Sequence, residues 1–310
     1  MSRHSRLAVV AAALLAVTLP ASSGPARAQN HPENDPNHCA NIWKEIGLPS
    51  APGAHITTVC HLGYITGHND DRKGPNWVIE RLSPDLTQGK ASRDDDDFAA
   101  DTLLPEKAQA KPPDYDNNGF NFDKGHNAPA ADFAGNQNFL NDTFFYSNAV
   151  PQIGPGFNRS IWRSLETQVR NLIGKNHPTM YVITGSVWQE DKPIKVSGDV
   201  CRTELVLPTV LPTSICPENH GKKNVQCEAG VSVPAAMFKI VYDPVMQNAF
   251  AVLMENESHT GKYKKVATYI EAHKVGVATI ENLTGLRFFS ALPTRKQNQI
   301  RSNCVDVKQH

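Results

Sequence analysis

Two short segments of the chain contain residue types that could hydrolyse a charged substrate. The first, residues 123–129, contains Lys124 and His126, and the second, residues 157–166, contains Asn158 and Glu166. A glycine precedes His126, so the imidazole can be presented without crowding. Because the ordinary pKa of histidine is about 6.5, His126 suits the role of general base for water near neutral pH.

The spacing of Asn158 and Glu166 indicates a shared side of a helix. The two residues are separated by a little over two helical turns, so a helix that starts at Asn158 turns both side chains the same way. Mg²⁺ prefers oxygen ligands and keeps several waters, so one amide oxygen and a substrate phosphate suffice to hold it. A base, a cation and a positioning group are what phosphodiester hydrolysis requires. Each residue alone also fits a structural role, such as a helix N-cap for Asn158.

The strands and helices that must position these residues do not alternate along the chain as they do in βαβ units. Apolar residues recur at helical spacing over residues 159–173, and Gly174 is placed to end that helix. Residues 92–122 are polar, as expected of a long surface loop that serves a site. Strand-like runs occupy residues 64–66, 77–79, 180–184, 233–241 and 248–254. This order predicts an α+β fold with a mainly antiparallel sheet core flanked by helices.

The N-terminal residues have the pattern of a secretory signal peptide. Arg3 and Arg6 precede an apolar run over residues 7–19, and Ala26-Arg27-Ala28 resembles a cleavage site. The run is shorter than the roughly 20 residues of a membrane span, although an uncleaved anchor is an alternative. We therefore expect residues 1–28 to be removed near Ala28, leaving a secreted or periplasmic protein without membrane contact. Residues 29–59 are predicted to form an irregular arm, and residues 60–310 a single domain.

Charge and cysteine content restrict the possible partners and the redox state. The chain has 31 basic and 31 acidic residues, and residues 1–28 contribute three arginines and no acid, which leaves 28 against 31. Nucleic-acid binding must then depend on a local basic groove. Six cysteines without a CxxC pair favour disulfides over a zinc site. We expect Cys39 to pair with Cys60 and the other four to pair within the C-terminal half, although the sequence leaves other connectivities open.

The first segment resembles a family signature. Asp123-Lys124-Gly125-His126, followed by Asn-Ala-Pro, is similar to the Asp-Arg-Gly-His signature of the DNA/RNA non-specific endonucleases, the ββα-metal family that includes endonuclease G. Other segments match the family in order and spacing across residues 60–290. They are Asn76-Trp77-Val78, the Arg93 segment, residues 101–105, residues 147–152, Phe157-Asn158, Trp162, Leu165-Glu166, residues 183–185 and residues 281–286.

The resemblance implies a role for each matching residue. Two strands would present His126 as general base, and one helix would present Asn158 as the sole protein ligand of Mg²⁺, with Mn²⁺ or another divalent ion as an alternative. Glu166 would orient metal-bound waters, and Arg93 would contact the scissile phosphate. Lys124 replaces the usual arginine, which keeps the charge but loses bidentate geometry. We expect Lys124 and Arg159 to contact substrate.

These inferences predict an exported, metal-dependent endonuclease that cuts DNA and RNA with little sequence preference and leaves 5′-phosphate ends. Family relatives are commonly dimers, so a homodimer is also an option. Alternatives are a catalytically weakened nucleic-acid-binding protein on the same scaffold, which Lys124 favours, and an enzyme for a smaller phosphodiester. Asp123 is expected to fix the histidine loop through backbone hydrogen bonds, and the acidic run 94–97 to be a solvated loop rather than a Ca²⁺ site.

Overall fold

The computed structural model describes residues 36–51, 53–93, 97–116, 119–188, 194–201, 204–207, 211–216, 227, 230–261 and 266–304. These residues belong to one contiguous unit, residues 31–310. The predicted signal peptide and residues 94–96 of the acidic run lie outside the described residues.

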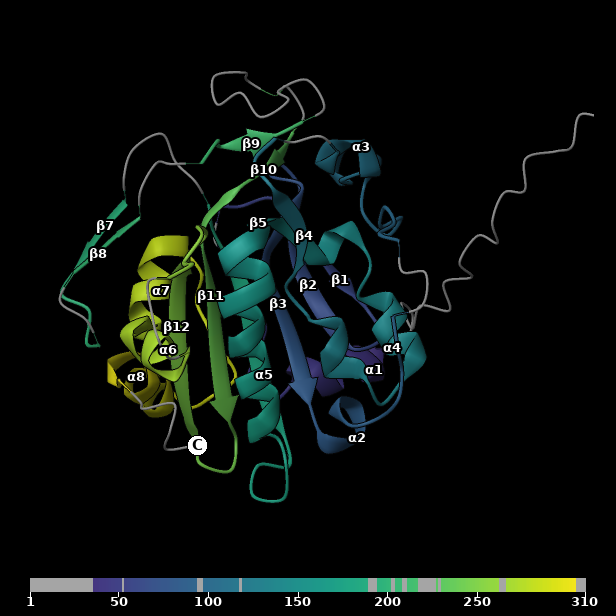
Figure 1. Cartoon of the computed structure of the whole chain (residues 1–310). Helices are drawn as coiled ribbons and strands as arrows, with labels where there is room; N and C mark the ends of the chain where they lie inside the picture. The colour runs from purple at the N-terminus through teal and green to yellow at the C-terminus, as the bar shows by residue number, and fades with distance from the viewer. Residues whose placement is uncertain are drawn as a thin grey trace, which may run out of the picture. The chain divides into compact units, whose positions relative to one another are not determined.

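A seven-stranded antiparallel sheet forms the centre of this unit, in the order β1-β2-β3-β6-β11-β12-β13. Figure 1 labels β1, β2, β3, β11 and β12 of this sheet. Its strands are β1 (Ile56–Cys60), β2 (Tyr64–Asn69), β3 (Gly74–Leu82), β6 (Met180–Trp188), β11 (Pro234–Asp243), β12 (Asn248–Glu255) and β13 (Lys274–Val275). The five strand-like runs of the sequence lie in β2, β3, β6, β11 and β12. The prediction of an α+β fold with a mainly antiparallel sheet is confirmed.

Both faces of the sheet are buried, because helices pack on each. The helices are α1 (Pro36–Trp43), α2 (Pro84–Thr87), α3 (Pro112–Tyr115), α4 (Gln137–Asp142), α5 (Arg163–Leu172), α6 (Val266–Ala272), α7 (Val277–Thr284) and α8 (Thr294–Ser302). One core cluster joins α1, α7 and α8 to one face of the sheet, and another joins α5 and α6 to the opposite face. Successive residues of β3 alternate between them, with Trp77 and Ile79 in the first cluster and Val78 in the second. This alternation is the period of two that a strand imposes on its side chains.

Shorter elements complete the unit. Three two-stranded sheets pair β4 (Phe122–His126) with β5 (Ala149–Ile153), β7 (Ile194–Ser197) with β8 (Glu204–Leu207), and β9 (Ser214–Ile215) with β10 (Val231–Ser232). Short helical turns are η1 (Glu106–Ala108), η2 (Ala130–Phe133), η3 (Tyr146–Asn148) and η4 (Gly154–Trp162). The predicted helix 159–173 corresponds to the end of η4 followed by α5, which ends just before Gly174 as expected.

Three disulfides cross-link the unit. Cys39 bonds to Cys60, Cys201 to Cys304, and Cys216 to Cys227. This connectivity confirms the prediction for Cys39 and Cys60, and it keeps the other four cysteines within the C-terminal half.

The predicted irregular arm 29–59 is wrong where the structure describes it. Residues 36–43 form α1, and residues 56–60 form β1, the edge strand of the main sheet. Ile42 and Ile46 are buried in the same core cluster as the sheet, so tertiary packing orders a segment whose Pro, Asn and His content suggested a loop. Among the described helices, none combines the length and the apolar character needed to cross a membrane.

The buried amide of Asn256 ties the β4–β5 hairpin to the main sheet. Asn256 is 1% exposed, and its Nδ2 donates to the carbonyls of Pro151 in β5 and Pro234 in β11, each at 2.9 Å. Its Oδ1 accepts from the Ile153 amide at 2.8 Å. One side chain thus satisfies three backbone groups of two different sheets.

We predict that Asn256→Ala destabilises the protein by about 2–4 kcal/mol, because three buried backbone groups lose their partner. Urea-induced unfolding of wild type and variant measures this difference. Asn298→Ala, at an exposed position of α8, is the matched control and should change stability little. An Asn256→Ala midpoint equal to that of the control would show that the amide does not support the hairpin.

Candidate active site

The β4–β5 hairpin presents the first predicted segment. Lys124 pairs with Pro151, Gly125 with Val150 and His126 with Ala149, so His126 is the last residue of β4. A Cβ atom on Gly125 would lie 2.2 Å from the Gln152 side chain. Glycine is therefore required at this position by the packing of β5.

His126 lies among aromatic rings. Its ring centroid is 4.9 Å from that of Phe98 and 4.9 Å from that of Phe144, which it meets edge-on. Its Nε2 is buried and has no hydrogen-bond partner among the described residues. Burial, together with the nearby positive charge of Arg93, lowers the pKa of His126 to about 3. The imidazole is therefore neutral near pH 7 and can accept a proton.

Asn158 is held by Asp123 across the junction between hairpin and helix. Its Nδ2 donates to Asp123 Oδ2 at 2.8 Å. An ionised carboxylate can only accept hydrogen bonds, so the amide group that faces Asp123 must be the NH₂ group of Asn158. The amide oxygen of Asn158 is then available to bind a metal ion. Arg159 donates from Nε to Asp123 Oδ2 at 2.8 Å and from Nη2 to Oδ1. The guanidinium and the amide thus share one carboxylate.

Asn158 and Glu166 occupy one continuous helical segment. The Arg163 amide donates to Asn158 O, five residues earlier, which makes a wider turn before α5 begins. Gly156 enters this turn with φ of 80°, a conformation that favours glycine. Asn158 and Glu166 both line the same cavity, as their spacing predicted.

Burial raises the pKa of Glu166 to about 7. The charge of Asp132 also raises it, whereas Lys239, Arg170 and Arg163 lower it. Lys239 is 1% exposed, donates from Nζ to Thr184 Oγ1 at 2.5 Å and lies over the Trp162 ring. Glu166 therefore lies near both an acidic side chain, Asp132, and a buried basic one, Lys239.

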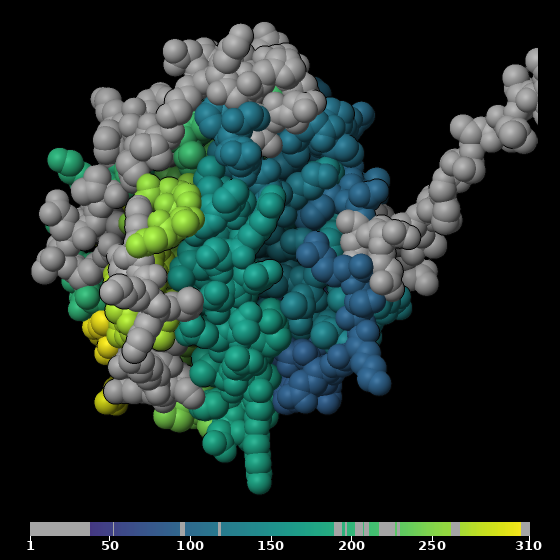
Figure 2. Space-filling view, in the orientation of Figure 1, coloured from purple at the N-terminus to yellow at the C-terminus, as the bar shows by residue number. Residues whose placement is uncertain are grey.

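One cavity of about 660 Å³ collects the predicted residues. All six side chains assigned from the sequence line it: Arg93, Lys124, His126, Asn158, Arg159 and Glu166. The surface over α5 (teal) crosses the centre of the face shown in Figure 2. Arg93 is exposed and lies 4.9 Å over the Phe144 ring, whereas Lys124 Nζ lies over the rings of Phe98 and Tyr146.

Two features of the cavity were not predicted. Asp123 was expected to fix the histidine loop through backbone hydrogen bonds, but its carboxylate instead bonds the side chains of Asn158 and Arg159. Phe98, which lies against both His126 and Lys124, had no distinguishing signal within a polar loop. Both contacts join segments far apart in the sequence, so only the fold creates them.

The protein groups that face the cavity fit a metal held mainly by water and substrate. Among the described residues, no three His, Cys, Asp or Glu side chains gather closely enough to hold a metal ion. A site with one amide oxygen and an outer carboxylate suits Mg²⁺, which keeps several waters and loses them reluctantly.

The known proteins that this chain resembles in sequence are nucleases. The chain is 30% identical over 250 residues to the mitochondrial nuclease of Saccharomyces cerevisiae, covering 79% of this chain and 68% of the relative. It is 31% identical over 260 residues to a nuclease of Syncephalastrum racemosum, covering 79% and 71%. The crystal structure of the complex of EndoG with EndoGI matches the fold, with a TM-score of 0.65 at 24% identity over 84% of this chain and 95% of that one.

These relatives overturn the expected secreted or periplasmic location and point to mitochondria. Mitochondrial nucleases of Saccharomyces cerevisiae and Schizosaccharomyces pombe are among them, as are the mitochondrial endonuclease G of Bos taurus and of Homo sapiens. The error has a physical basis. Residues 1–28 contain arginines and serines without any acidic residue, a composition that mitochondrial transit peptides also have.

The sequence profile described as DNA/RNA non-specific endonuclease matches residues 45–295. This range includes every residue of the cavity described above and most of both core clusters. The chain belongs to the DNA/RNA non-specific endonuclease family.

Proposed function

We propose that this protein is a divalent-metal-dependent endonuclease that hydrolyses phosphodiester bonds of DNA and RNA without strong sequence preference, leaving 5′-phosphate ends. The observation that carries the proposal is the convergence of a neutral histidine, a carboxylate-oriented amide and cationic side chains on one cavity. A smaller phosphodiester would not need a cavity of about 660 Å³ with exposed arginines along it.

His126 acts as the general base. Since burial and Arg93 lower its pKa to about 3, it stays unprotonated throughout the neutral range. The low pKa disfavours the imidazolium that proton transfer creates, and the negative phosphate of bound substrate offsets this by favouring a nearby positive charge. His126 lines the cavity, so its imidazole can receive the proton of a water that lies there.

Asn158 would hold the metal through its amide oxygen, and Asp123 keeps that amide oriented by accepting from its nitrogen. A bound Mg²⁺ would stabilise the charge that develops on the phosphate and the leaving oxygen. Glu166, which lines the same cavity, would orient water beside that ion. Positive charge in the cavity favours the ionised form of Glu166, whose pKa near 7 is raised by burial.

Exposed cations bind the substrate through its phosphates. Arg93 contacts the scissile phosphate, and Lys124 contacts a neighbouring one. Arg159 is fixed in place by Asp123, which leaves part of its guanidinium for substrate. Contacts of this kind recognise the backbone rather than base edges, which accounts for low sequence preference. Assembly as a homodimer remains a prediction.

We predict that purified protein with Mg²⁺ degrades plasmid DNA, single-stranded DNA and RNA, and that EDTA stops all three reactions. His126→Ala should lower kcat at least about 100-fold because the base is lost, while DNA binding persists. Gel assays and fluorescence anisotropy measure the two properties. His55→Ala, at an exposed position outside the cavity, is the control. Wild-type protein that binds DNA but cuts none of these substrates would instead support the weakened nucleic-acid-binding alternative.

We predict that Glu166→Gln raises Tm in EDTA at pH 8 by a few degrees but lowers kcat in Mg²⁺. The folded-state pKa of Glu166 is about 7, above the ordinary 4.5, so its ionisation opposes folding. The wild-type disadvantage is absent below about pH 4.5, grows between pH 4.5 and 7, and is complete above about pH 7. Calorimetry at pH 4 and pH 8 measures this, and an equal Tm difference at both pH values would contradict the burial of the charge.

We predict that Lys124→Ala raises KM for DNA several-fold. The slope of log Kd against log salt concentration should also fall by about the contribution of one phosphate contact. Lys124→Arg should retain low KM, since it keeps the charge and adds bidentate geometry. Lys44→Ala is the matched control, because Lys44 is exposed and does not line the cavity. An unchanged salt dependence in Lys124→Ala would remove Lys124 from the substrate contacts.

A further inference from the structure

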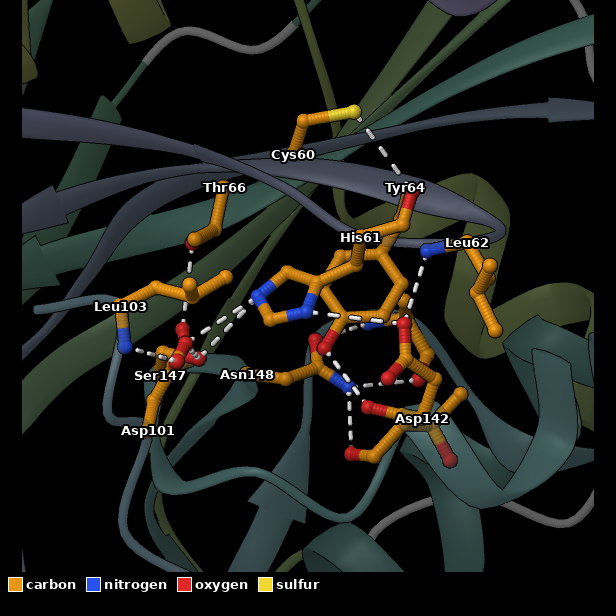
Figure 3. A network of polar contacts seen from close by, with 12 residues as sticks. Cys60, His61, Leu62, Tyr64, Thr66, Asp101, Leu103, Asp142, Ser147 and Asn148 are labelled. Atoms are coloured by element: carbon orange, nitrogen blue, oxygen red, sulfur yellow. Dashed lines mark hydrogen bonds and ion pairs between the residues drawn. The ribbon is translucent and has the colours of Figure 1, made fainter. Parts of the chain in front are cut away.

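A buried network of polar and charged side chains is centred on His61 (Figure 3). His61 is 0% exposed and sits between β1 and β2. Its Nε2 is 3.2 Å from Asp101 Oδ2, and its Nδ1 is 3.6 Å from Asp142 Oδ2. The ring stacks on Tyr64 at a centroid distance of 4.4 Å and on Phe145 at 5.4 Å. The two carboxylates come from different segments, so the imidazole bridges them.

Asp101 is connected to Phe98, the side chain that packs against one side of the His126 ring. Ser147 Oγ donates to Asp101 Oδ2 at 2.5 Å. Two residues before Asp101, Ala99 donates its amide to Phe144 O at 2.9 Å and accepts from the Tyr146 amide at 3.0 Å. Phe98, next along this segment, packs against the His126 ring. The position of Asp101 therefore determines where the Phe98 wall lies.

From Ser147 the network leads to the backbone that follows His126. The neighbouring Asn148 is 0% exposed, and its Oδ1 accepts from the Ala128 amide at 2.8 Å. Its Nδ2 donates to Ala128 O at 2.9 Å, and the Asn127 amide donates to Asn148 O at 2.9 Å. The chain on the C-terminal side of His126 is thus clamped to the same segment that Asp101 holds.

We infer that His61 is a positioning residue for His126: bound between Asp101 and Asp142, it holds together the two segments that enclose the catalytic imidazole. His61 does not line the cavity, so it acts through these segments. The inference rests on the proposed role of His126 as general base.

Asp101 and Asp142 favour a positive charge on His61. Two carboxylates beside one buried imidazole stabilise its protonated form. Burial alone lowers the pKa of His61, but the hydrogen bonds and charges of Asp101 and Asp142 outweigh it and raise the pKa to about 9. Tyr64, the other titratable group against the ring, has its pKa raised well above the ordinary value and stays neutral. A raised histidine pKa contributes stability below about pH 6.5, and this is lost as pH rises through 9.

The first test is His61→Gln, which keeps a polar side chain but removes the cation. At pH 7.5, kcat for plasmid cleavage should fall roughly 10- to 100-fold, because small displacements of a catalytic group have effects of this size. KM should change less than kcat, since Arg159 is held by Asp123, outside the network. His55→Gln is the matched control: His55 also pairs with an aspartate, Asp71 at 3.1 Å, but at an exposed site. Circular dichroism confirms that each protein is folded at the assay temperature.

The second test uses the pH dependence of kcat, and it serves even if His61→Gln does not fold. Wild type should lose activity as pH rises toward 9, when the bridge loses its charge. Asp142→Asn removes one of the two anions that hold the proton, so its alkaline limb should move toward neutral pH. An unchanged limb in Asp142→Asn, or kcat values in folded His61→Gln equal to wild type, would overturn the inference. Inactive wild-type protein would instead refute the proposed function itself.

Discussion

The carboxylate of Asp123 joins the strand that carries His126 to the helical segment that carries Asn158. Its two oxygens accept from the Asn158 amide and from the Arg159 guanidinium, so a residue of β4 fixes two residues of η4. Everything proposed for the cavity depends on this bond, because it decides which end of the amide is free. Without it, the hairpin and helix could pack together while the amide pointed either way.

Burial then sets opposite electrostatic conditions at two positions of one cavity. It lowers the pKa of His126 to about 3 and raises that of Glu166 to about 7, since in each case the charged form loses contact with water. The free cavity therefore favours neutral forms of both groups. A bound phosphate would favour the protonated, positive form of His126, and a bound divalent ion would favour the ionised form of Glu166. Each group therefore reaches its charged form more easily when substrate and metal are present.

The scaffold that holds this cavity is fastened by buried polar side chains rather than by the main sheet alone. The β4–β5 hairpin is separate from the seven-stranded sheet. Asn256 bonds it to β11 on one side, and the network from His61 through Asn148 holds it on the other. Buried polar contacts of this kind depend on direction and so favour one geometry, whereas apolar packing alone tolerates small shifts.

The sequence was sufficient for what depends on local pattern. Apolar runs located the main strands, helical spacing located α5, and the even set of cysteines indicated disulfides. The separation of Asn158 and Glu166 placed both side chains on one side before any fold was known, because a helix repeats every 3.6 residues. Residue type at ordered motifs also named the family to which the chain belongs.

Contacts between distant segments had no such pattern. The helix α1 in the N-terminal arm, the bonds of Asp123, the Phe98 wall and the buried charge of His61 each depend on groups that meet only in the folded chain. The direction of a pKa shift likewise depends on burial and on neighbours, neither of which a linear sequence contains. Local spacing determined which residues could do the chemistry, and long-range packing decided how they are oriented and charged.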